Sequence, residues 1–458
     1  MPTALLLALM TVKTVAALDV GANLGGWLVI EPSMFDQADA FPHDAAENDF
    51  IRWHRGAQGD EFALTTIKNH WNYFVDDAML DGLQRLGITS VRVPIGYWMF
   101  DTPVGGTSMR DFGFQTEGFA TGGVNALEAL LPKLQARNMT LMLDLHALPG
   151  CDARCIGFAG VHCDDASGFF NGAKPSQPIT RCYGGDAYTS SRADDRSWYE
   201  IALDYVAAMA AWVGALPAKH RALIKGATVM NEPGLGQVFT QQISEFYERS
   251  VPLLGNNVTL AVNVIGGSFS VVDGANWMGG EIKAGKFPSN TLGDYHHYYN
   301  WDGQHDAGWY LDKVCNGGEG WWAYPQNVPT FLGEWSLAVN GDSDLHDLTN
   351  PSDVDFMKKF YANQASYYQS QPNVVGAYFW NFRMGSGWDP RPTENQPHGH
   401  HVNGASYNKS LDGFPLTSWS LLELGAHGIA VPFSTLRITG RCQCNGCSST
   451  VQRMRAAK

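Results

Sequence analysis

Short apolar runs alternate with segments of helical periodicity along most of this chain. The segments Asp76–Gly87 and Trp198–Ala215 carry apolar residues at steps of three and four, which is typical of a helix with one buried face. Strands that alternate with such helices favour a parallel sheet with helices outside it. Eight units of this kind favour a closed (β/α)8 TIM barrel, of the α/β class, over an open sheet.

The expected strands are Ala22–Ile30, Thr89–Ile95, Thr140–His146, a run from Ile224 to Asn231, Val258–Val264, Thr291–His296, a run that ends at Glu334, and Val374–Trp380. Further helices are expected over Asn125–Arg137, Phe239–Leu254 and Asp353–Gln369.

Two of the expected strands end in a glutamate. The run Ile224–Met230 is followed by Asn231, Glu232 and Pro233, and the strand should end there because proline has no backbone N–H and a fixed φ. Another short apolar run ends at Glu334. A single glutamate is more often part of a loop ion pair, but strand ends carry the catalytic groups of a (β/α)8 barrel. Two such carboxylates are what glycoside hydrolysis requires: one protonates the leaving oxygen, and the other attacks the sugar or activates water.

The other expected strand ends carry polar or aromatic side chains that should converge on these glutamates. They are Glu31, Arg92, Asp144, His146, His296, His297, Tyr298, Trp380 and Asn381. An arginine and a tyrosine hydroxyl can keep a nucleophilic carboxylate ionised and aimed, and an asparagine can hold the sugar 2-hydroxyl. Arg92 could equally be a structural ion-pair partner, and His146 a core histidine. Strand alternation places Asp144 on the face of His146; we expect Asp144 and His297 to be structural.

Composition argues against several classes of partner. The chain has 458 residues and a formal net charge of −14, which argues against nucleic acid and anionic membrane surfaces. No later run reaches the ~20 apolar residues that a membrane span needs. Residues 1–17 combine a short apolar core with small residues before a plausible cleavage point, although no basic residue precedes that core. This segment resembles a secretory signal, so we expect a secreted protein.

Eight cysteines also support an oxidising compartment. Four of them cluster in Gly150–Asp195, a segment after the third strand that is too long for a plain connection. They are Cys151, Cys155, Cys163 and Cys182. We expect disulfides to staple this loop, and we expect it to overhang the barrel mouth together with the long loop Met384–Pro415 after the eighth strand. The histidines of Pro397–His401 could suggest a metal, but no strand-end carboxylate accompanies them, so a solvated loop is the expectation.

Residues 18–440 should form the catalytic domain, and residues 441–458 a Cys-rich tail. The tail cysteines are Cys442, Cys444 and Cys447. Three ligands at crowded spacing with no nearby histidine disfavour zinc, so disulfides are expected. At least one of the three must then pair outside the tail, for instance with Cys315 or with another chain. Asn138, Asn257 and Asn408 are glycosylation acceptors if the chain is secreted.

Six short motifs, in order between about residues 20 and 385, resemble the exo-1,3-β-glucanases of glycoside hydrolase family 5. They are Asn23-Leu-Gly-Gly-Trp with Glu31-Pro32, Val91-Arg-Val-Pro-Ile-Gly-Tyr-Trp98, Leu143-Asp-Leu-His146 with Pro149-Gly150, Asn231-Glu-Pro233, His296-His-Tyr298, and Gly333-Glu-Trp-Ser336. The resemblance implies a (β/α)8 barrel and retaining hydrolysis, with Glu232 as acid/base and Glu334 as nucleophile. The residues that it places around the first sugar are Arg92, His146, Asn231, His296 and Tyr298, with Glu31 and Trp380 holding that sugar.

These expectations describe a secreted monomer, outside the cell or in the cell wall, that removes glucose from the non-reducing end of 1,3-β-glucan. Its partner is the polysaccharide or its oligosaccharides, and it needs no metal or organic cofactor. The same scaffold also supports an endo-acting β-glucanase or mannanase, or a transglycosylase, and the loops at the barrel mouth decide between them. A non-catalytic glycan-binding protein is disfavoured because both glutamates are present.

Overall fold

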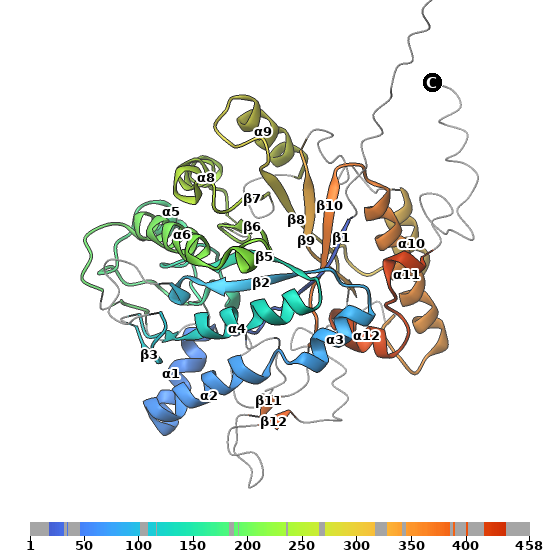
Figure 1. Ribbon diagram of the computed structural model, residues 1–458, viewed down its shortest axis with the longest axis horizontal. Coiled ribbons are helices and arrows are strands. Elements are labelled where there is room, and N and C mark those ends of the chain that lie inside the picture. The colour runs from blue at the N-terminus through green and yellow to red at the C-terminus, as the bar shows by residue number, and fades with distance from the viewer. Residues whose placement is uncertain are drawn as a thin grey trace, which may run out of the picture.

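Eight short strands pair in parallel and close into a barrel, in the order β1-β10-β9-β8-β7-β6-β5-β2 (Figure 1). The strands are β1 Asp19–Asn23, β2 Ser90–Gly96, β5 Thr140–Ala147, β6 Ile224–Thr228, β7 Leu260–Asn263, β8 Leu292–Tyr299, β9 Thr330–Val339 and β10 Val374–Phe379. The predicted (β/α)8 barrel is therefore confirmed. The computed structural model describes residues 18–31, 34, 46–100, 109–115, 117–182, 187–190, 192–234, 237–264, 271–316, 328–340, 345–384, 388–389, 400–401 and 416–436.

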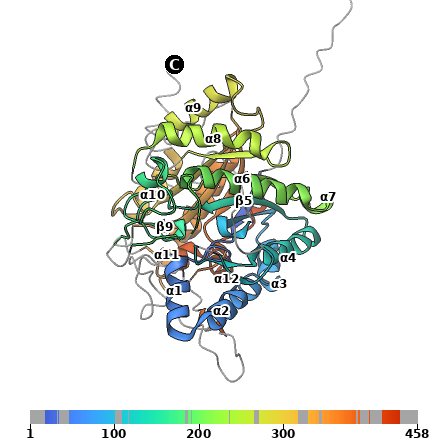
Figure 2. The same cartoon turned by 90° about the vertical axis from the view of Figure 1, so that its left-hand side faces the viewer.

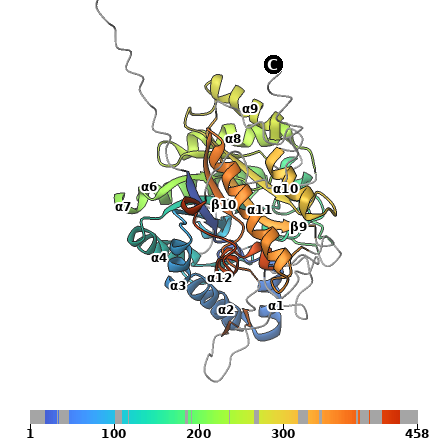
Figure 3. The same ribbon diagram turned by 90° about the vertical axis from the view of Figure 1, so that its right-hand side faces the viewer.

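Helices cover the outside of the barrel. They are α3 Asp77–Arg85, α4 Gly123–Ala136, α6 Trp198–Ala215, α8 Thr240–Leu254, α9 Val271–Lys283, α10 Ala307–Asn316, α11 Pro351–Ser370 and α12 Leu421–Ala426. Helices α6 and α8 lie on one side (Figure 2), and α10 and α11 on the other (Figure 3). The predicted helix Trp198–Ala215 is confirmed at both ends. Its N-cap residue, Ser197, accepts a hydrogen bond from the Glu200 amide at 3.2 Å, as a capping serine does.

Two helices lie between β1 and α3 and were not predicted: α1 Glu47–Gln58 and α2 Asp60–Tyr73. The helices α9 and α10 were not predicted either. Glycines weaken helical propensity, and the sequence of α9 contains Gly274, Gly279 and Gly280. In α1, three of the five buried residues are polar, namely Glu47, Asn48 and His54, so its buried face is not an apolar one in the sequence.

Four strand ends differ from the prediction by three residues or more. Strand β8 continues to Tyr299 instead of ending at His296, so Tyr298 lies within the strand. Strand β1 ends at Asn23 instead of Ile30, because the chain turns at Gly26, whose φ is +73°. Strand β6 ends at Thr228, so the Asn-Glu-Pro motif follows the strand instead of closing it. Strand β9 continues to Val339, so Glu334 lies within the strand and not at its end. The five strand residues after Glu334 are all buried and, apart from Ser336, apolar, which favours continued pairing.

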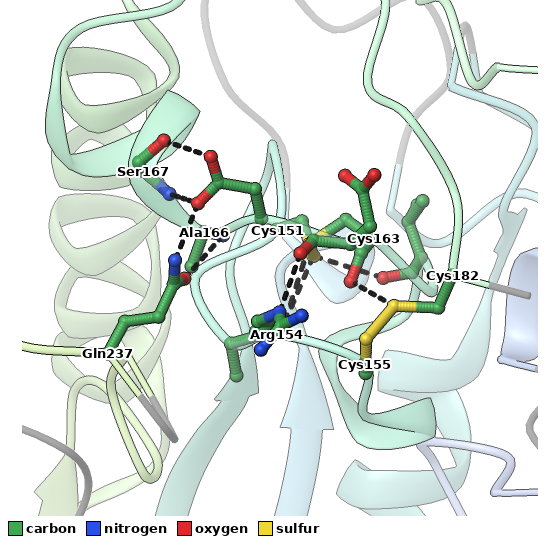
Figure 4. The surroundings of a disulfide bond; sticks show 12 residues. Cys151, Arg154, Cys155, Cys163, Ala166, Ser167, Cys182 and Gln237 are labelled. Atoms are coloured by element: carbon green, nitrogen blue, oxygen red, sulfur yellow. Dashed lines mark hydrogen bonds between the residues drawn. A yellow bond between two sulfur atoms is a disulfide. The ribbon is translucent and has the colours of Figure 1, made fainter.

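The long loop after β5 is stapled by two disulfides, Cys151–Cys163 and Cys155–Cys182 (Figure 4). This confirms the prediction for these four cysteines, and Cys315 is disulfide-bonded as well. The loop is also attached to the segment that follows β6. Gln237 accepts from the Ala166 amide at 2.9 Å and donates to Asp165 at 2.8 Å (Figure 4).

Several predictions concern residues outside the described part of the chain. These are the signal segment 1–17, the tail 441–458 with its cysteines, Asn408, and Pro397 to Gly399 of the histidine-rich loop. In the loop after β10, the short strands β11 Trp388–Asp389 and β12 His400–His401 pair with each other. The hairpin of β3 Gly113–Phe114 and β4 Ala120–Thr121 lies after β2. Among the described helices, none has the length and apolar character needed to cross a bilayer.

Candidate active site

Arg92, on β2, is the centre of a buried network at the carboxyl ends of the barrel strands. Its Nη1 donates to Asn23 Oδ1 and to Glu334 Oε1, each at 2.9 Å. Its Nη2 donates to Asn231 Oδ1 at 2.9 Å and lies 3.1 Å from Asp144 Oδ2. Arg92 is fully buried, so its charge is balanced by these carboxylates instead of by water. The guanidinium is thus an ion-pair partner inside the barrel and a neighbour of a predicted catalytic group at once.

Both carboxylate oxygens of Glu334 are held. Oε1 accepts from Arg92, and Oε2 accepts from the Tyr298 hydroxyl at 2.6 Å. Burial and the adjacent Glu334 carboxylate raise the pKa of Tyr298 well above its usual value, so this hydroxyl keeps its proton and remains a donor. Two donors fixed in different strands, β2 and β8, therefore set the orientation of the Glu334 carboxylate.

The residue before Glu334 must be a glycine. The β8–β9 ladder shifts register at this point, and a Cβ on Gly333 would lie 2.0 Å from Asp294 Oδ1. Asp294 is buried and accepts from Thr228 Oγ1 at 2.6 Å. Burial alone would raise its pKa, but Arg92 and His296 outweigh this effect and lower the pKa of Asp294 to about 2. Its negative charge is therefore a permanent part of the barrel interior.

Glu232 has a less regular backbone than Glu334. It lies beyond the end of β6 and has a φ of +39°, in a region that few non-glycine residues adopt. Such residues persist only where the surroundings fix them, and they cluster at functional sites. The Oε1 of Glu232 accepts from His296 Nδ1 at 2.6 Å. One oxygen of Glu232 and one oxygen of Glu334 lie within 4.8 Å of each other.

His296 lies among three carboxylates. Besides Glu232, its Nδ1 lies 3.4 Å from Glu334 Oε2, and its Nε2 lies 3.6 Å from Asp294 Oδ1. Burial opposes protonation, but Glu334 and Asp294 outweigh it and raise the pKa of His296 to about 10. The carboxylates thus favour a proton on the ring, and Nδ1 donates it to Glu232 at 2.6 Å.

Glu31, His146 and Trp380 form a wall next to the network. The rings of His146 and Trp380 are stacked, with centroids 5.7 Å apart and planes inclined by 8°. His146 Nδ1 lies 2.5 Å from Asp144 Oδ2, which orients the ring so that Nε2 lies 3.9 Å from Glu31 Oε1. Burial, partly offset by His146, raises the pKa of Glu31 to about 7. Phe158, from the disulfide-bonded loop, packs edge-on against His146 at 4.9 Å.

Asn381, also expected to converge on the glutamates, instead donates to the backbone carbonyls of Gly25 and Arg383. The structure brings the nine residues predicted to act at the site into one connected cluster. They are Glu31, Arg92, His146, Asn231, Glu232, His296, Tyr298, Glu334 and Trp380. Asp144, predicted to be structural, holds both Arg92 and His146. His297 is half-buried; partial burial lowers its pKa to about 3, and its ring packs edge-on against Tyr299.

Four residues of the cluster were not singled out from the sequence as site residues: Asn23, Phe158, Asn263 and Asp294. Asp294 is two residues before His296 on β8, so strand alternation could have placed it on the same face. Asn263 ends β7, and its Nδ2 lies 3.1 Å from His296 Nε2. Asn23 is likewise the last residue of its strand, β1, and in the sequence it stands out only as part of the motif Asn23-Leu-Gly-Gly-Trp. Nothing in the sequence of the disulfide loop distinguishes Phe158.

Glu232, His296 and Glu334 place one donor atom each within 4.8 Å of one another, which is close enough to consider a metal ion. The chemistry of the donors does not fit. A histidine ligates a metal through an unprotonated nitrogen, whereas Nδ1 of His296 carries the proton donated to Glu232 and Nε2 already faces the Arg92 guanidinium at 3.4 Å. Arg92 also places a positive charge against Glu334. The cluster is therefore suited to proton transfer and anion stabilisation.

Comparison with known proteins agrees with this architecture. The sequence model of the cellulase family (glycosyl hydrolase family 5) matches residues 56–373. The chain is 26% identical over 330 residues to the probable glucan 1,3-beta-glucosidase A of Emericella nidulans, covering 70% of this chain and 67% of that protein. It is 24% identical over 380 residues to the glucan endo-1,6-beta-glucosidase B of the same organism, covering 79% and 80%.

Among solved structures, rutinosidase from Aspergillus niger superposes with a TM-score of 0.54 at 16% identity, covering 90% of this chain and 97% of that one. At this identity the likeness supports the fold alone. The family match extends over more than half of the sequence and includes most of the barrel. This chain therefore belongs to glycoside hydrolase family 5.

Proposed function

We propose that the protein is a retaining β-glucan hydrolase that releases glucose from the non-reducing end of 1,3-β-glucan. The proposal rests on the separation of the two glutamates: one carboxylate oxygen of Glu232 and one of Glu334 lie within 4.8 Å of each other. Retaining glycosidases hold their two carboxyls about 5–5.5 Å apart, whereas inverting enzymes leave room for a water at about 6.5–9.5 Å. The short separation supports a double displacement.

The contacts of the two glutamates support different roles. Arg92 and Tyr298 both donate to Glu334 and fix the direction of its two oxygens, which suits this carboxylate to attack the anomeric carbon as the nucleophile. Glu232 accepts from His296 at Oε1, so the proton of its acid form would sit on Oε2. Glu232 gives that proton to the leaving oxygen as the C–O bond breaks. It then takes a proton from the water that releases glucose from Glu334.

The wall of the site offers polar atoms that a sugar can satisfy. Among the described residues, Glu31 Oε1, His146 Nε2 and Asn231 Nδ2 are buried and make no hydrogen bond. Buried polar atoms are normally hydrogen-bonded, and leaving one unpaired costs about 1–3 kcal/mol. The hydroxyl groups of a sugar can both donate and accept, so they can satisfy all three atoms. The ring of Trp380 supplies an aromatic face beside them.

Two of the similar proteins are named as glucan 1,3-beta-glucosidases, from Emericella nidulans and Schwanniomyces occidentalis. This supports 1,3-β-glucan as the substrate and removal of single glucose units as the action. The 1,3-glucosidase matches cover about two thirds of those proteins, whereas the match to the endo-1,6-beta-glucosidase covers 80%. Endo-acting hydrolysis of 1,6-β-glucan is therefore the second candidate.

Both candidates fit a secreted protein. Disulfides form and persist in oxidising compartments, and two of them staple the loop that reaches the site. The acceptors Asn138 and Asn257 both lie in exposed turns, where a glycan could be attached without disturbing the core.

Product analysis distinguishes the candidates. The full chain is incubated with a linear 1,3-β-glucan and with a linear 1,6-β-glucan, and early products are separated by chromatography while their anomers are followed by NMR. We expect glucose as the sole early product from the 1,3-linked polymer, released as the β anomer. A ladder of 1,6-linked oligosaccharides would move the protein to the second candidate. Release of the α anomer from either polymer would overturn the retaining mechanism.

A further inference from the structure

The backbone that carries Glu31 is not held by the barrel ladder. Strand β1 ends at Asn23, and the chain turns before it reaches Glu31. Between Leu28 and Glu31, the described part of the structure contains two backbone hydrogen bonds. One is local, from the Met34 amide to the Glu31 carbonyl at 2.9 Å. The other runs from the Ile30 amide to Glu47 Oε2 at 2.7 Å, and this one reaches another element.

Glu47 is placed as a fixed acceptor. It is the first residue of α1 and is 0% exposed. An acidic side chain is favoured in the first turn of a helix, but complete burial of a carboxyl is costly. Burial raises the pKa of Glu47 to about 8, although the Ile30 amide opposes this effect. The hydrogen bond that Glu47 accepts from the Ile30 amide explains why a carboxyl is kept in this buried place.

The first turn of α1 is itself attached to the disulfide-bonded loop. The Asn48 amide donates to the Gly160 carbonyl at 3.1 Å. Arg181 donates to Asn48 Oδ1 at 3.0 Å and forms an ion pair with Asp49. Arg181 precedes Cys182, a cysteine of the staple. The anchor for Glu31 is therefore fixed to the same loop that places Phe158 against His146.

We propose that Glu47 is a positioning residue for Glu31: it holds the Ile30 amide so that the Glu31 carboxyl lies beside His146 and Trp380. The proposal rests on the proposed function in that Glu31 is taken to contact the first sugar. Loss of the Glu47 acceptor leaves the barrel intact and lets the 28–31 backbone move. Misplacement of a binding group by about 1 Å can lower turnover by about a hundredfold.

A double-mutant cycle tests this coupling with linear 1,3-β-glucan as the substrate. The variants are Glu47→Ala, Glu31→Ala and the double substitution, and kcat/KM is measured for each. We expect Glu47→Ala to lower kcat/KM by about tenfold to a hundredfold and to have no further effect when Glu31 is already alanine. If the two losses multiply in the double variant, Glu47 does not act through Glu31 and the proposal is overturned.

Two controls separate positioning from folding. Glu47→Gln keeps an oxygen that can accept from Ile30, so it should restore most of the activity. Glu61→Ala removes an exposed glutamate from the first turn of α2 and should have no effect. If Glu47→Gln is as impaired as Glu47→Ala, an acceptor for Ile30 is not what the site requires.

Hydrogen–deuterium exchange gives a second readout that needs no substrate. In Glu47→Ala, amide protection should fall in peptides that cover residues 28–31 and remain unchanged in peptides from β5 and β9. Unchanged protection of residues 28–31 would overturn the proposal whatever the activity. A wild-type protein that cleaves no β-glucan, together with lost protection in Glu47→Ala, would instead refute the proposed function and leave the positioning role in place.

Discussion

The two glutamates of the site differ in how the fold holds them. Glu334 lies within β9, takes hydrogen bonds from two other strands, and its side chain is 7% exposed. Glu232 lies past the end of β6 at a positive φ, has one described partner in His296, and its side chain is 15% exposed. A nucleophile must approach the anomeric carbon from a fixed direction, and a position within a strand fixes the direction of the side chain. An acid/base must exchange its proton with the leaving group and then with water, which a position at the rim permits.

The largest effect should come from the strand-held residue. Glu334→Gln removes the proposed attacking carboxylate while keeping its shape, so kcat on 1,3-β-glucan should fall by about 10⁴-fold or more, since loss of a covalent nucleophile can cost about 10⁶-fold. Steady-state assays of the variant and of the surface control Glu245→Gln check this. Retention of a tenth of wild-type turnover would contradict the role given to Glu334.

The rim residue should show a loss that depends on the leaving group. Glu232→Ala should lower kcat on glucan by about 10²- to 10⁴-fold, but cleavage of a dinitrophenyl β-glucoside should begin with a rapid burst, because that leaving group needs no proton. Added azide should speed the slow second step and yield a β-glucosyl azide. A variant equally slow on both substrates, with no burst and no response to azide, would remove the distinction between the two glutamates.

A smaller effect is expected from one of the two donors to Glu334. Tyr298→Phe deletes the hydrogen bond to Oε2, and a hydrogen bond to a charged group contributes about 1.5–3 kcal/mol, so kcat/KM should fall by about tenfold to a hundredfold. Tyr299→Phe is the matched control, since Tyr299 packs against Phe360 away from the carboxylates. Equal losses in the two variants would indicate a packing defect instead of a lost donor.

The smallest expected effect concerns how the stability of the folded protein depends on pH. Burial raises the pKa of Glu31 to about 7 and that of Glu47 to about 8. It also raises the pKa of Asp152, a buried residue next to Cys151 in the disulfide-bonded loop, to about 7. Stability from a raised carboxyl pKa is complete below the unfolded value of about 4.5 and is lost as the pH rises through the folded value. His296 acts in the same direction, between about 6.5 and 10.

The lowered pKa of Asp294 acts in the opposite sense, so its contribution disappears as the pH falls from about 4 to 2. The melting temperature should therefore peak near pH 4–5 and decline toward pH 8.5, which calorimetry across this range checks. Glu47→Gln should flatten the decline. A melting temperature that rises steadily up to pH 8.5 would contradict these assignments.

Much of the fold and of the site could be predicted from the sequence, because the eight apolar runs and the polar residues that follow them are regular signals. The barrel, the four stapled cysteines and the convergence of the site residues were predicted in this way. What failed was the distinction between the two glutamates: both were predicted to close a strand. Strand β9 continues past Glu334 into a buried run that ends at Val339. Arg92 and Tyr298 satisfy the carboxylate inside the ladder, and these partners come from other strands, so no local pattern announces them.

The helices α1 and α2 were missed for a related reason. They lie outside the βα alternation, and the buried Glu47 and Asn48 of α1 resemble surface residues in a sequence. Their burial depends on Ile30 and on the disulfide loop, which are separated from them along the chain. Phe158 likewise gains its place only when the loop closes onto His146.

Covalent trapping tests the central claim most directly. The protein is incubated with a 2-deoxy-2-fluoro-β-glucoside that carries a dinitrophenyl leaving group, digested, and analysed by peptide mass spectrometry. We predict one fluoroglucosyl group on the peptide that contains Glu334, attached at that residue and absent from Glu334→Gln. A label on Glu232, or rapid turnover to the α anomer with no label on any residue, would contradict the account of a strand-held nucleophile and a rim acid/base.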